Sequence, residues 1–304
     1  MKKILIAAPI SETFKEWLLD HNFELILFPS ATYQNEDFEG IITSNKLVLD
    51  ETLLKTFSSL KWIARLGSGM EIIDTNYCNF NGIKYFNSPN GIANSVAEHT
   101  MGMMLSLLHQ IPHSTQSIKK GKWAREKHRG VELSGKTIGI IGFGHTGKAL
   151  AKKLSVFTKN ILIYDKYCSN FQVEYIKESN IEDIQQHADI ISFHVPLNEE
   201  TKNYYNLEFC LKMRKEHILV NTSRGPIAPT HVIIEGLKNG KIKGACLDVL
   251  EEEENINLHL ENKTSSIYTI LKQNVILTPH IAGYSFDAIE NMSLELLEQL
   301  KKII

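Results

Sequence analysis

The stretch TIGIIGFGHTGKALAKKL, residues 137–154, decides the fold of this chain. Its apolar start runs straight into Gly142-x-Gly144-x-x-Gly147, and a helix-forming pattern begins inside this motif. Glycine permits a tight turn at Gly142, close approach of a pyrophosphate at Gly144, and close contact between helix and strand at Gly147. The amides and positive dipole end of the helix then favour a phosphate. The motif therefore predicts a dinucleotide-binding unit, with a glycine turn that binds nothing as the alternative.

The next apolar run ends in an acidic residue that bears on the choice of cofactor. NILIYD, residues 160–165, places Asp165 eighteen residues after Gly147. A carboxylate at this position accepts hydrogen bonds from both hydroxyls of the adenosine ribose and repels a 2′-phosphate. The pattern predicts NAD rather than NADP, although Lys166 beside it weakens this preference slightly. A surface aspartate without a ligand is the alternative.

The rest of the chain repeats the alternation of apolar runs and amphipathic helical patterns. Near-continuous apolar runs such as ADIISFHVP (188–196) and HILVNTS (217–223) are typical of parallel strands that are covered on both faces. We therefore predict an α/β fold of two doubly wound parallel-sheet domains, Rossmann-like or flavodoxin-like, with a cleft between them. A long apolar helix at 95–111 joins the two, with Ser95 as its N-cap and Glu98 completing a capping box.

Length and composition are those of an ordinary globular protein with two domains. The chain has 304 residues, of which 43% are hydrophobic and 22% charged. Its formal net charge of -2 gives no electrostatic case for nucleic acid or an anionic membrane as a partner. The basic stretch at 117–130 contains turn-forming glycines and is better explained as a helix end and connector.

The start of the chain and its cysteines indicate a cytoplasmic protein. MKKILIAAPI has the lysines and apolar run of a signal peptide, but Pro9 ends the run and no small-residue cleavage site follows, so we expect a first strand. No stretch approaches the roughly 18 apolar residues that span a membrane. The four cysteines form no CxxC and no paired histidine spacing. This argues against disulfides and against a metal site, and for a reducing compartment.

Polar residues with useful chemistry follow three of the predicted strands. ILVNTSRGPI ends in a turn with Arg224, GACLDVLEEEE carries Asp248 and Glu253, and NVILTPHIAG carries His280. The carboxyl ends of parallel strands line the ligand crevice, so these side chains are expected to converge. A guanidinium can hold a carboxylate, an imidazole can take a hydroxyl proton, and a carboxylate can orient the imidazole. Taken singly, each residue also has an ordinary explanation as a turn residue, a helix cap or a surface glutamate.

These motifs together resemble those of a known enzyme family over nearly the whole chain. NSPNGIANSVAEHTMGMML, QIPHSTQSIKKGKW, VELSGKTIGIIGFGHTG, NTSRGPI, GACLDV and LTPHIAG carry the pattern of the D-isomer-specific 2-hydroxyacid dehydrogenases, in the same order. Within that family the chain is most similar to the D-3-phosphoglycerate dehydrogenases. The resemblance implies an NAD-dependent oxidoreductase that transfers hydride between C2 of a small 2-hydroxy acid and nicotinamide.

The resemblance also implies a role for individual residues. Arg224, Glu253 and His280 form the catalytic set, and Glu253 is chosen among its neighbours because it lies five residues after Asp248. The turn of Gly67, Ser68, Gly69 and Met70 would hold the substrate carboxylate through its amides, which is physically sensible for an anion nest. The NAD-binding residues implied are Gly142, Gly144, His145, Thr146, Gly147, Asp165, Val195, Thr222, Ser223 and Asp248, the last near the carboxamide.

Domain organisation and assembly follow from the same resemblance. It implies a substrate-binding domain of residues 1–95 plus 285–304, an NAD-binding Rossmann domain of residues 96–284, and a homodimer built on the latter. Some relatives carry a C-terminal regulatory domain; we expect none here, and no feedback control of that kind.

Three departures from the family pattern bear on the substrate. Glu254 stands where a proline usually follows the catalytic glutamate, and the connection from Glu253 to His280 is longer than usual. Phosphoglycerate-type relatives tend to have an arginine where this chain has Thr43 to Lys46, so Lys46 is the candidate phosphate contact. We expect 3-phosphoglycerate, and hence a role in serine biosynthesis. Glyoxylate, hydroxypyruvate or another 2-keto acid is the alternative substrate, and a non-catalytic NAD-sensing protein is the alternative of another class.

Overall fold

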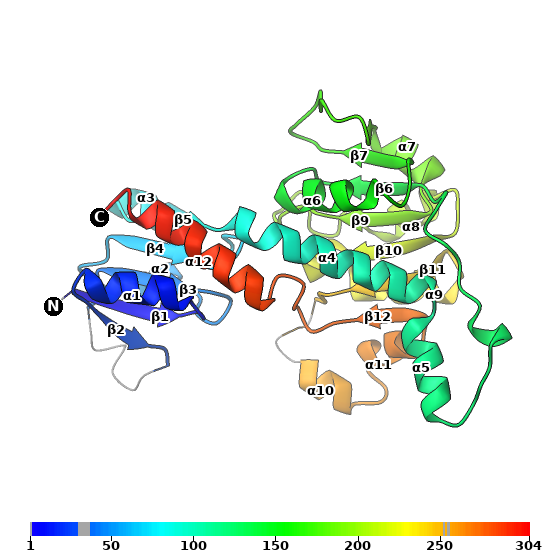
Figure 1. Ribbon diagram of the computed structural model, residues 1–304, viewed down its shortest axis with the longest axis horizontal. Coiled ribbons are helices and arrows are strands. Elements are labelled where there is room, and N and C mark those ends of the chain that lie inside the picture. The colour runs from blue at the N-terminus through cyan, green and yellow to red at the C-terminus, as the bar shows by residue number, and fades with distance from the viewer. Residues whose placement is uncertain (1, 30–36, 252, 254–255) are drawn as a thin grey trace. The chain divides into compact units, whose positions relative to one another are not determined.

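The computed structural model describes residues 2–29, 37–251, 253 and 256–304. The chain divides into two compact units, Met1–Ser95 with Gly283–Ile304 (unit 1) and Val96–Ala282 (unit 2). Each unit is built on one sheet, and all neighbouring strands in both sheets are parallel (Figure 1). The predicted fold class of two parallel α/β sheets is confirmed.

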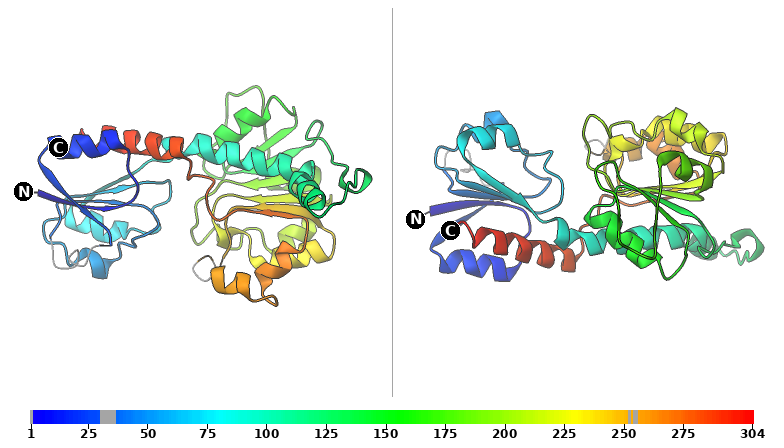
Figure 2. Two further views of the ribbon diagram at one scale, coloured as in Figure 1. Left: turned by 60° about the horizontal axis from the view of Figure 1, so that its bottom comes forward. Right: turned by 90° about the horizontal axis from the view of Figure 1, so that it is seen from above.

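Unit 1 has a five-stranded sheet in the order β2-β1-β3-β4-β5, which is the doubly wound order of flavodoxin-like folds. Helices α1 and α12 pack on one face of the sheet, and α2 and α3 on the other (Figure 2). The elements are β1 (Lys2–Ala7), α1 (Glu12–Asp20), β2 (Phe23–Leu27), β3 (Gly40–Thr43), α2 (Glu51–Leu54), β4 (Trp62–Arg65), α3 (Thr75–Asn81), β5 (Lys84–Asn87) and α12 (Phe286–Leu300). The helix at the end of the chain thus completes the core of the N-terminal sheet.

Unit 2 has a seven-stranded sheet in the order β12-β11-β10-β9-β6-β7-β8. Helix α4, whose residues up to Ser95 belong to unit 1, and helix α6 cover one face, and α7, α8, α9 and α11 cover the other. The elements are α4 (Pro89–Leu108), α5 (Ile111–Lys119), η2 (Glu126–His128), β6 (Ile138–Ile141), α6 (His145–Leu154), β7 (Ile161–Tyr164), β8 (Lys177–Glu178), α7 (Ile181–His187), β9 (Ile190–Phe193), α8 (Leu207–Lys212), β10 (His217–Asn221), η3 (Gly225–Ile227), α9 (Thr230–Lys238), β11 (Ile242–Leu247), α10 (Ile256–Glu261), α11 (Ser266–Leu271) and β12 (Val275–Leu277). The strand order reverses between β6 and β9, so the carboxyl ends of these strands form the switch point where such sheets bind ligands.

The long helix α4 begins earlier than the sequence indicates. The prediction of Ser95 as its N-cap is wrong, because the helix starts at Pro89 and Ser95 lies inside it. Proline suits the first helical position, and the amides of Asn90 and Gly91 are capped by the carboxylate of Glu295 in α12, with the Gly91 bond at 2.7 Å. A cap supplied from more than 200 residues away leaves no local signal. Neither α4 nor any other helix in the described ranges is long and apolar enough to cross a membrane.

Candidate active site

The glycine loop between β6 and α6 has the shape that its sequence predicts. Gly142 has a φ of 96°, and a Cβ there would lie 2.3 Å from the carbonyl oxygen of His194. A Cβ on Gly147 would lie 2.1 Å from the carbonyl oxygen of Gly142. Any side chain at these two positions would push β6, α6 and the end of β9 apart. Both glycines are therefore required by the turn itself.

The start of α6 fits a bound pyrophosphate. Gly144 is the N-cap of α6 and has no side chain to cap the helix, and a Cβ at Gly144 would meet nothing within 4 Å. His145 is the first residue of the helix and is exposed. The Thr146 hydroxyl lies 3.3 Å from Nδ1 of His194, whose Nε2 is 2.8 Å from Ser192 Oγ. Burial lowers the pKa of His194 to about 4, so this side chain adds no positive charge at neutral pH.

Asp165 lies at the end of β7, beside the glycine loop. Its Oδ2 accepts a hydrogen bond from the amide of Phe143 at 2.7 Å, and its Oδ1 accepts from the amides of Tyr167 at 2.9 Å and Cys168 at 3.0 Å. A carboxylate has about four acceptor positions. The three amides therefore fix the orientation of this carboxylate and leave acceptor capacity on Oδ2 for a ribose hydroxyl.

His280 and Glu253 form a hydrogen-bonded pair in the loops after β12 and β11. Nδ1 of His280 lies 2.8 Å from Oε2 of Glu253, and Oε1 of the same carboxylate accepts from the amide of Leu250 at 3.0 Å. Burial works to raise the pKa of Glu253, but the hydrogen bond and charge of His280, the Leu250 amide and the charge of Arg224 together lower it. Glu253 is thus ionised at neutral pH. Because a carboxylate only accepts, Nδ1 carries the hydrogen and Nε2 is left as the basic nitrogen.

Asp248 holds the turn that carries His280. The carboxylate of Asp248 is buried and accepts from the Thr278 hydroxyl at 2.6 Å and from the amides of Ile281 at 2.9 Å and Ala282 at 2.8 Å. Its carbonyl oxygen accepts from the His280 amide at 2.8 Å. His280 has a φ of 55°, a left-handed conformation that a non-glycine residue adopts at some cost. The bonds to Asp248 on either side of His280 offset that cost.

Arg224 follows β10, the strand next to β11. Its Nη1 donates to the carbonyl oxygen of Ser223 at 2.7 Å, and the side chain is half-buried. A Cβ on the next residue, Gly225, would lie 2.0 Å from the carbonyl of Leu250, so the loop after β10 lies directly against the loop that holds Glu253. The carboxyl ends of β10, β11 and β12, three neighbouring strands, thus carry Arg224, Glu253 and His280.

The remaining residues predicted to bind NAD in unit 2 have structural partners of their own. The Thr222 hydroxyl lies 3.1 Å from that of Thr100, and the Ser223 hydroxyl donates to the carbonyl oxygen of Phe193. Val195 packs against the hydrophobic core on the α9 side of the sheet. These side chains fix the loops after β9 and β10.

The Gly67–Met70 turn lies in unit 1, after β4. The amide of Gly67 already donates to Ser88 Oγ at 3.0 Å. An anion in this turn would therefore use the amides of Ser68, Gly69 and Met70. Lys46 is exposed in the turn after β3, which is the neighbouring strand.

Arg65 is a candidate functional residue that our sequence analysis did not single out. It ends β4, is only 3% exposed, and donates through Nη1 to the carbonyl oxygen of Leu66 at 2.5 Å and through Nη2 to Oδ1 of Asn45. A Cβ on Gly67 would lie 2.7 Å from Nη1, so the guanidinium lies against the Gly67–Met70 turn. The available signal was a lone arginine at the end of an otherwise apolar strand.

Two departures from the family pattern follow Glu253 in the chain: Glu254 itself and the long connection to His280. Glu254 lies outside the described residues. Within the described part of the long connection to His280, residues 256–261 and 266–271 form the short helices α10 and α11.

Comparison with known proteins gives a consistent result. A family profile for the D-isomer specific 2-hydroxyacid dehydrogenase, NAD binding domain, matches residues 101–282. The chain is 37% identical over 252 residues to a hydroxypyruvate reductase of Thermotoga maritima, covering 82% of this chain and 79% of that protein. It is 33% identical over 312 residues to a D-3-phosphoglycerate dehydrogenase of Methanocaldococcus jannaschii, covering 100% of this chain and 58% of that one. The chain thus spans little more than half the length of such relatives.

A solved structure has the same fold. The crystal structure of D-lactate dehydrogenase from Aquifex aeolicus, complexed with NAD and lactic acid, matches with a TM-score of 0.84 at 28% identity. The match covers 99% of this chain and 95% of that chain.

Proposed function

The chain belongs to the D-isomer specific 2-hydroxyacid dehydrogenase family and carries its NAD-binding domain, and from this we propose that it interconverts a small D-2-hydroxy acid and the corresponding 2-keto acid. The observation that carries the proposal is the 2.8 Å pair of His280 and Glu253, with Arg224 on the adjacent loop. A base with a fixed tautomer and a neighbouring guanidinium are the groups that this reaction needs.

The proposed chemistry assigns one task to each side chain. NAD, when bound, supplies the hydride acceptor. Nε2 of His280 takes the proton of the substrate hydroxyl as the hydrogen on C2 leaves, and returns it when the reaction runs backwards. Glu253 stabilises the imidazolium that forms. Arg224 binds the carboxylate or the 2-keto oxygen through paired N–H groups.

We propose that unit 1 binds the acid end of the substrate. The amides of Ser68, Gly69 and Met70 are the candidate cradle, and Arg65 adds positive charge from beneath the turn. Backbone amides of a turn together with a fixed guanidinium favour an anion. An Arg65→Met variant should raise KM for the acid much more than it changes the dissociation constant for NADH.

3-Phosphoglycerate is the substrate that we propose first. Relatives named D-3-phosphoglycerate dehydrogenase cover 98–100% of this chain. Lys46 follows β3, and Arg65 ends the neighbouring strand β4. Hydroxypyruvate or glyoxylate is the second candidate, supported by the relatives with those names and by the lack of an arginine among residues 43–46. NADH oxidation with phosphohydroxypyruvate, hydroxypyruvate, glyoxylate and pyruvate distinguishes the two, since a preference for an unphosphorylated acid would contradict the first.

The test of catalysis itself is a histidine substitution. His280→Ala should abolish turnover and retain NADH binding, because the side chain holds the proton and not the nucleotide. His187→Ala, at the exposed end of α7, is the matched control and should keep full activity. Undiminished turnover in His280→Ala would refute the assigned role. NADH binding without turnover in the wild-type chain on any acid would instead support a non-catalytic NAD sensor.

We also propose a homodimer, formed through unit 2, in the cytoplasm. Four large apolar side chains are exposed on α5 and the segment that follows it: Ile111, Ile118, Trp123 and Val131. Exposed large apolar side chains on one segment favour a protein–protein contact there. The four cysteines are all unpaired, which is typical of a reducing compartment. Light scattering after size exclusion should give twice the mass of one chain for the wild type. An Ile118→Ser, Trp123→Ser double variant should give the mass of a single chain.

A further inference from the structure

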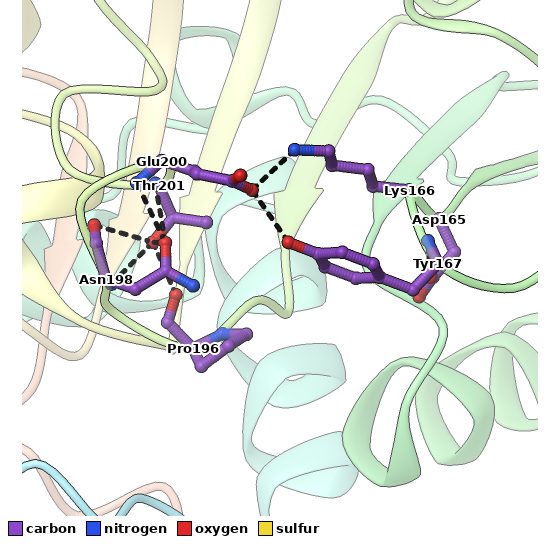
Figure 3. Close-up of polar contacts among 7 residues, drawn as sticks. All are labelled: Asp165, Lys166, Tyr167, Pro196, Asn198, Glu200 and Thr201. Atoms are coloured by element: carbon purple, nitrogen blue, oxygen red, sulfur yellow. Dashed lines mark hydrogen bonds and ion pairs between the residues drawn. The ribbon is translucent and has the colours of Figure 1, made fainter.

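A polar cluster joins the end of β7 to the loop after β9, beside the predicted ribose site (Figure 3). Lys166 Nζ donates to Oε2 of Glu200 at 2.6 Å, and the Tyr167 hydroxyl donates to the same oxygen at 2.7 Å. Lys166 and Tyr167 directly follow Asp165 in the chain, and Glu200 is tied to both of them. The cluster therefore borders the place where a ribose 2′ group is expected.

The loop that carries Glu200 is itself well ordered. Oδ1 of Asn198 accepts from the amides of Glu200 and Thr201 at 3.0 Å each. The Thr201 hydroxyl donates to the carbonyl oxygen of Pro196 at 2.6 Å (Figure 3). Glu200 is thus presented to β7 by a turn with its own hydrogen bonds.

The ion pair has little value for stability. The side chains of Lys166 and Glu200 are 54% and 55% exposed, and exposed pairs contribute little to folding. The hydrogen bond to Lys166, followed by that to Tyr167, lowers the pKa of Glu200, and the bond to Glu200 raises the pKa of Lys166. Both groups are therefore charged at neutral pH, and their effect on a nearby ligand is electrostatic.

We propose that Glu200 is a residue that determines cofactor choice. It engages Lys166, the residue directly after Asp165, and so withholds this cation from a 2′-phosphate. Together with Asp165 it also places two carboxylates near the ribose edge. Taken by itself, Lys166 favours NADP; paired with Glu200, it does not. This inference rests on the proposed binding of a dinucleotide by unit 2.

The test compares NADH and NADPH binding to the full chain by nucleotide fluorescence. In Glu200→Gln the ratio of the NADPH to the NADH dissociation constant should fall about tenfold, because Lys166 becomes available for a charge-assisted bond to the phosphate. Glu199→Gln removes the same charge from the neighbouring exposed residue, which makes no bond to Lys166, and should change the ratio by less than about twofold.

A double variant isolates the part played by Lys166. Lys166→Met in the Glu200→Gln background should return the ratio to near the wild-type value. An unchanged ratio in Glu200→Gln, with NADH still bound, would overturn this inference and leave the proposed function standing. The same holds if the fall in the ratio persists after Lys166→Met is added, or if Glu199→Gln causes an equal fall. A wild-type chain that binds neither nucleotide would overturn the proposed function, and this inference with it.

Discussion

The contact between Glu253 and His280 predicts the effect of replacing Glu253 by glutamine. The substitution keeps the size of the side chain and an oxygen that can accept from Nδ1 of His280, but it removes the negative charge. In the wild-type protein the two groups are 2.8 Å apart and their side chains are 38% and 32% exposed. With the Nδ1 bond kept, the new N–H2 group faces the Leu250 amide, so the variant removes the charge of Glu253 and this one hydrogen bond while the packing is kept.

The size of the effect follows from this geometry. Opposite charges about 4 Å apart interact by about 1 kcal/mol in water and about 4 kcal/mol at the effective dielectric constant of a protein surface. Partial exposure of both groups gives an intermediate value of about 2 kcal/mol. Since the imidazolium forms in the transition state, kcat for hydroxy acid oxidation should fall about 30-fold.

Steady-state rates of hydroxy acid oxidation with NAD at saturating substrate measure this fall in kcat. Glu261 is an exposed acidic residue at the end of α10, so Glu261→Gln is the control for a general change in charge and should leave kcat unchanged. The reasoning would be refuted if Glu253→Gln kept kcat within about twofold of wild type, or if Glu261→Gln lost as much activity.

Three further substitutions probe stability. Gly142→Ala places a Cβ 2.3 Å from a carbonyl oxygen at a φ of 96°, so the free energy of unfolding in urea should fall by about 2 kcal/mol or more; an unchanged midpoint would contradict the strained turn. In Asp248→Asn the new N–H2 group faces at least one of the three donors that bond to the carboxylate. This should lower the free energy of unfolding by about 2 kcal/mol and also lower kcat. Full stability would mean that other contacts hold the turn of His280. Burial lowers the pKa of His217 to about 4. Below about pH 6.5 the unfolded chain therefore takes up a proton that the folded chain does not. The free energy of unfolding should then fall by up to about 1.4 kcal/mol per pH unit between pH 6.5 and 4. In His217→Gln this part of the slope should vanish, and an unaltered slope would show that His217 is not the group responsible.

Part of the site was predictable because it depends on local sterics. The strand, the glycine turn and the helix of residues 137–154 impose one backbone path, since only glycine fits at Gly142 and Gly147. The strand-end positions of Arg224 and His280 followed from apolar runs that stop at a turn. The choice of Glu253 from an acidic run came from the family resemblance, and its contact with His280 supports that choice.

Other parts of the site depend on partners that are remote in sequence. Asp248 appeared as a strand-end carboxylate, but its bonds to Thr278, Ile281 and Ala282 depend on β11 and β12 being neighbours. Arg65 gained its place against the Gly67–Met70 turn from the folding of unit 1.

The sequence by itself determined the two parallel α/β sheets, the glycine loop and the strand ends that carry the proposed catalytic residues, because periodicity and glycine sterics act over a few neighbouring residues. Tertiary structure alone decided where α4 begins, since its cap is Glu295, and which residue Lys166 pairs with, since Glu200 comes from the loop after β9. Both depend on a carboxylate brought in by a distant segment. Charge is a property of the residue, but its effect on a ligand is set by the partners that folding places beside it.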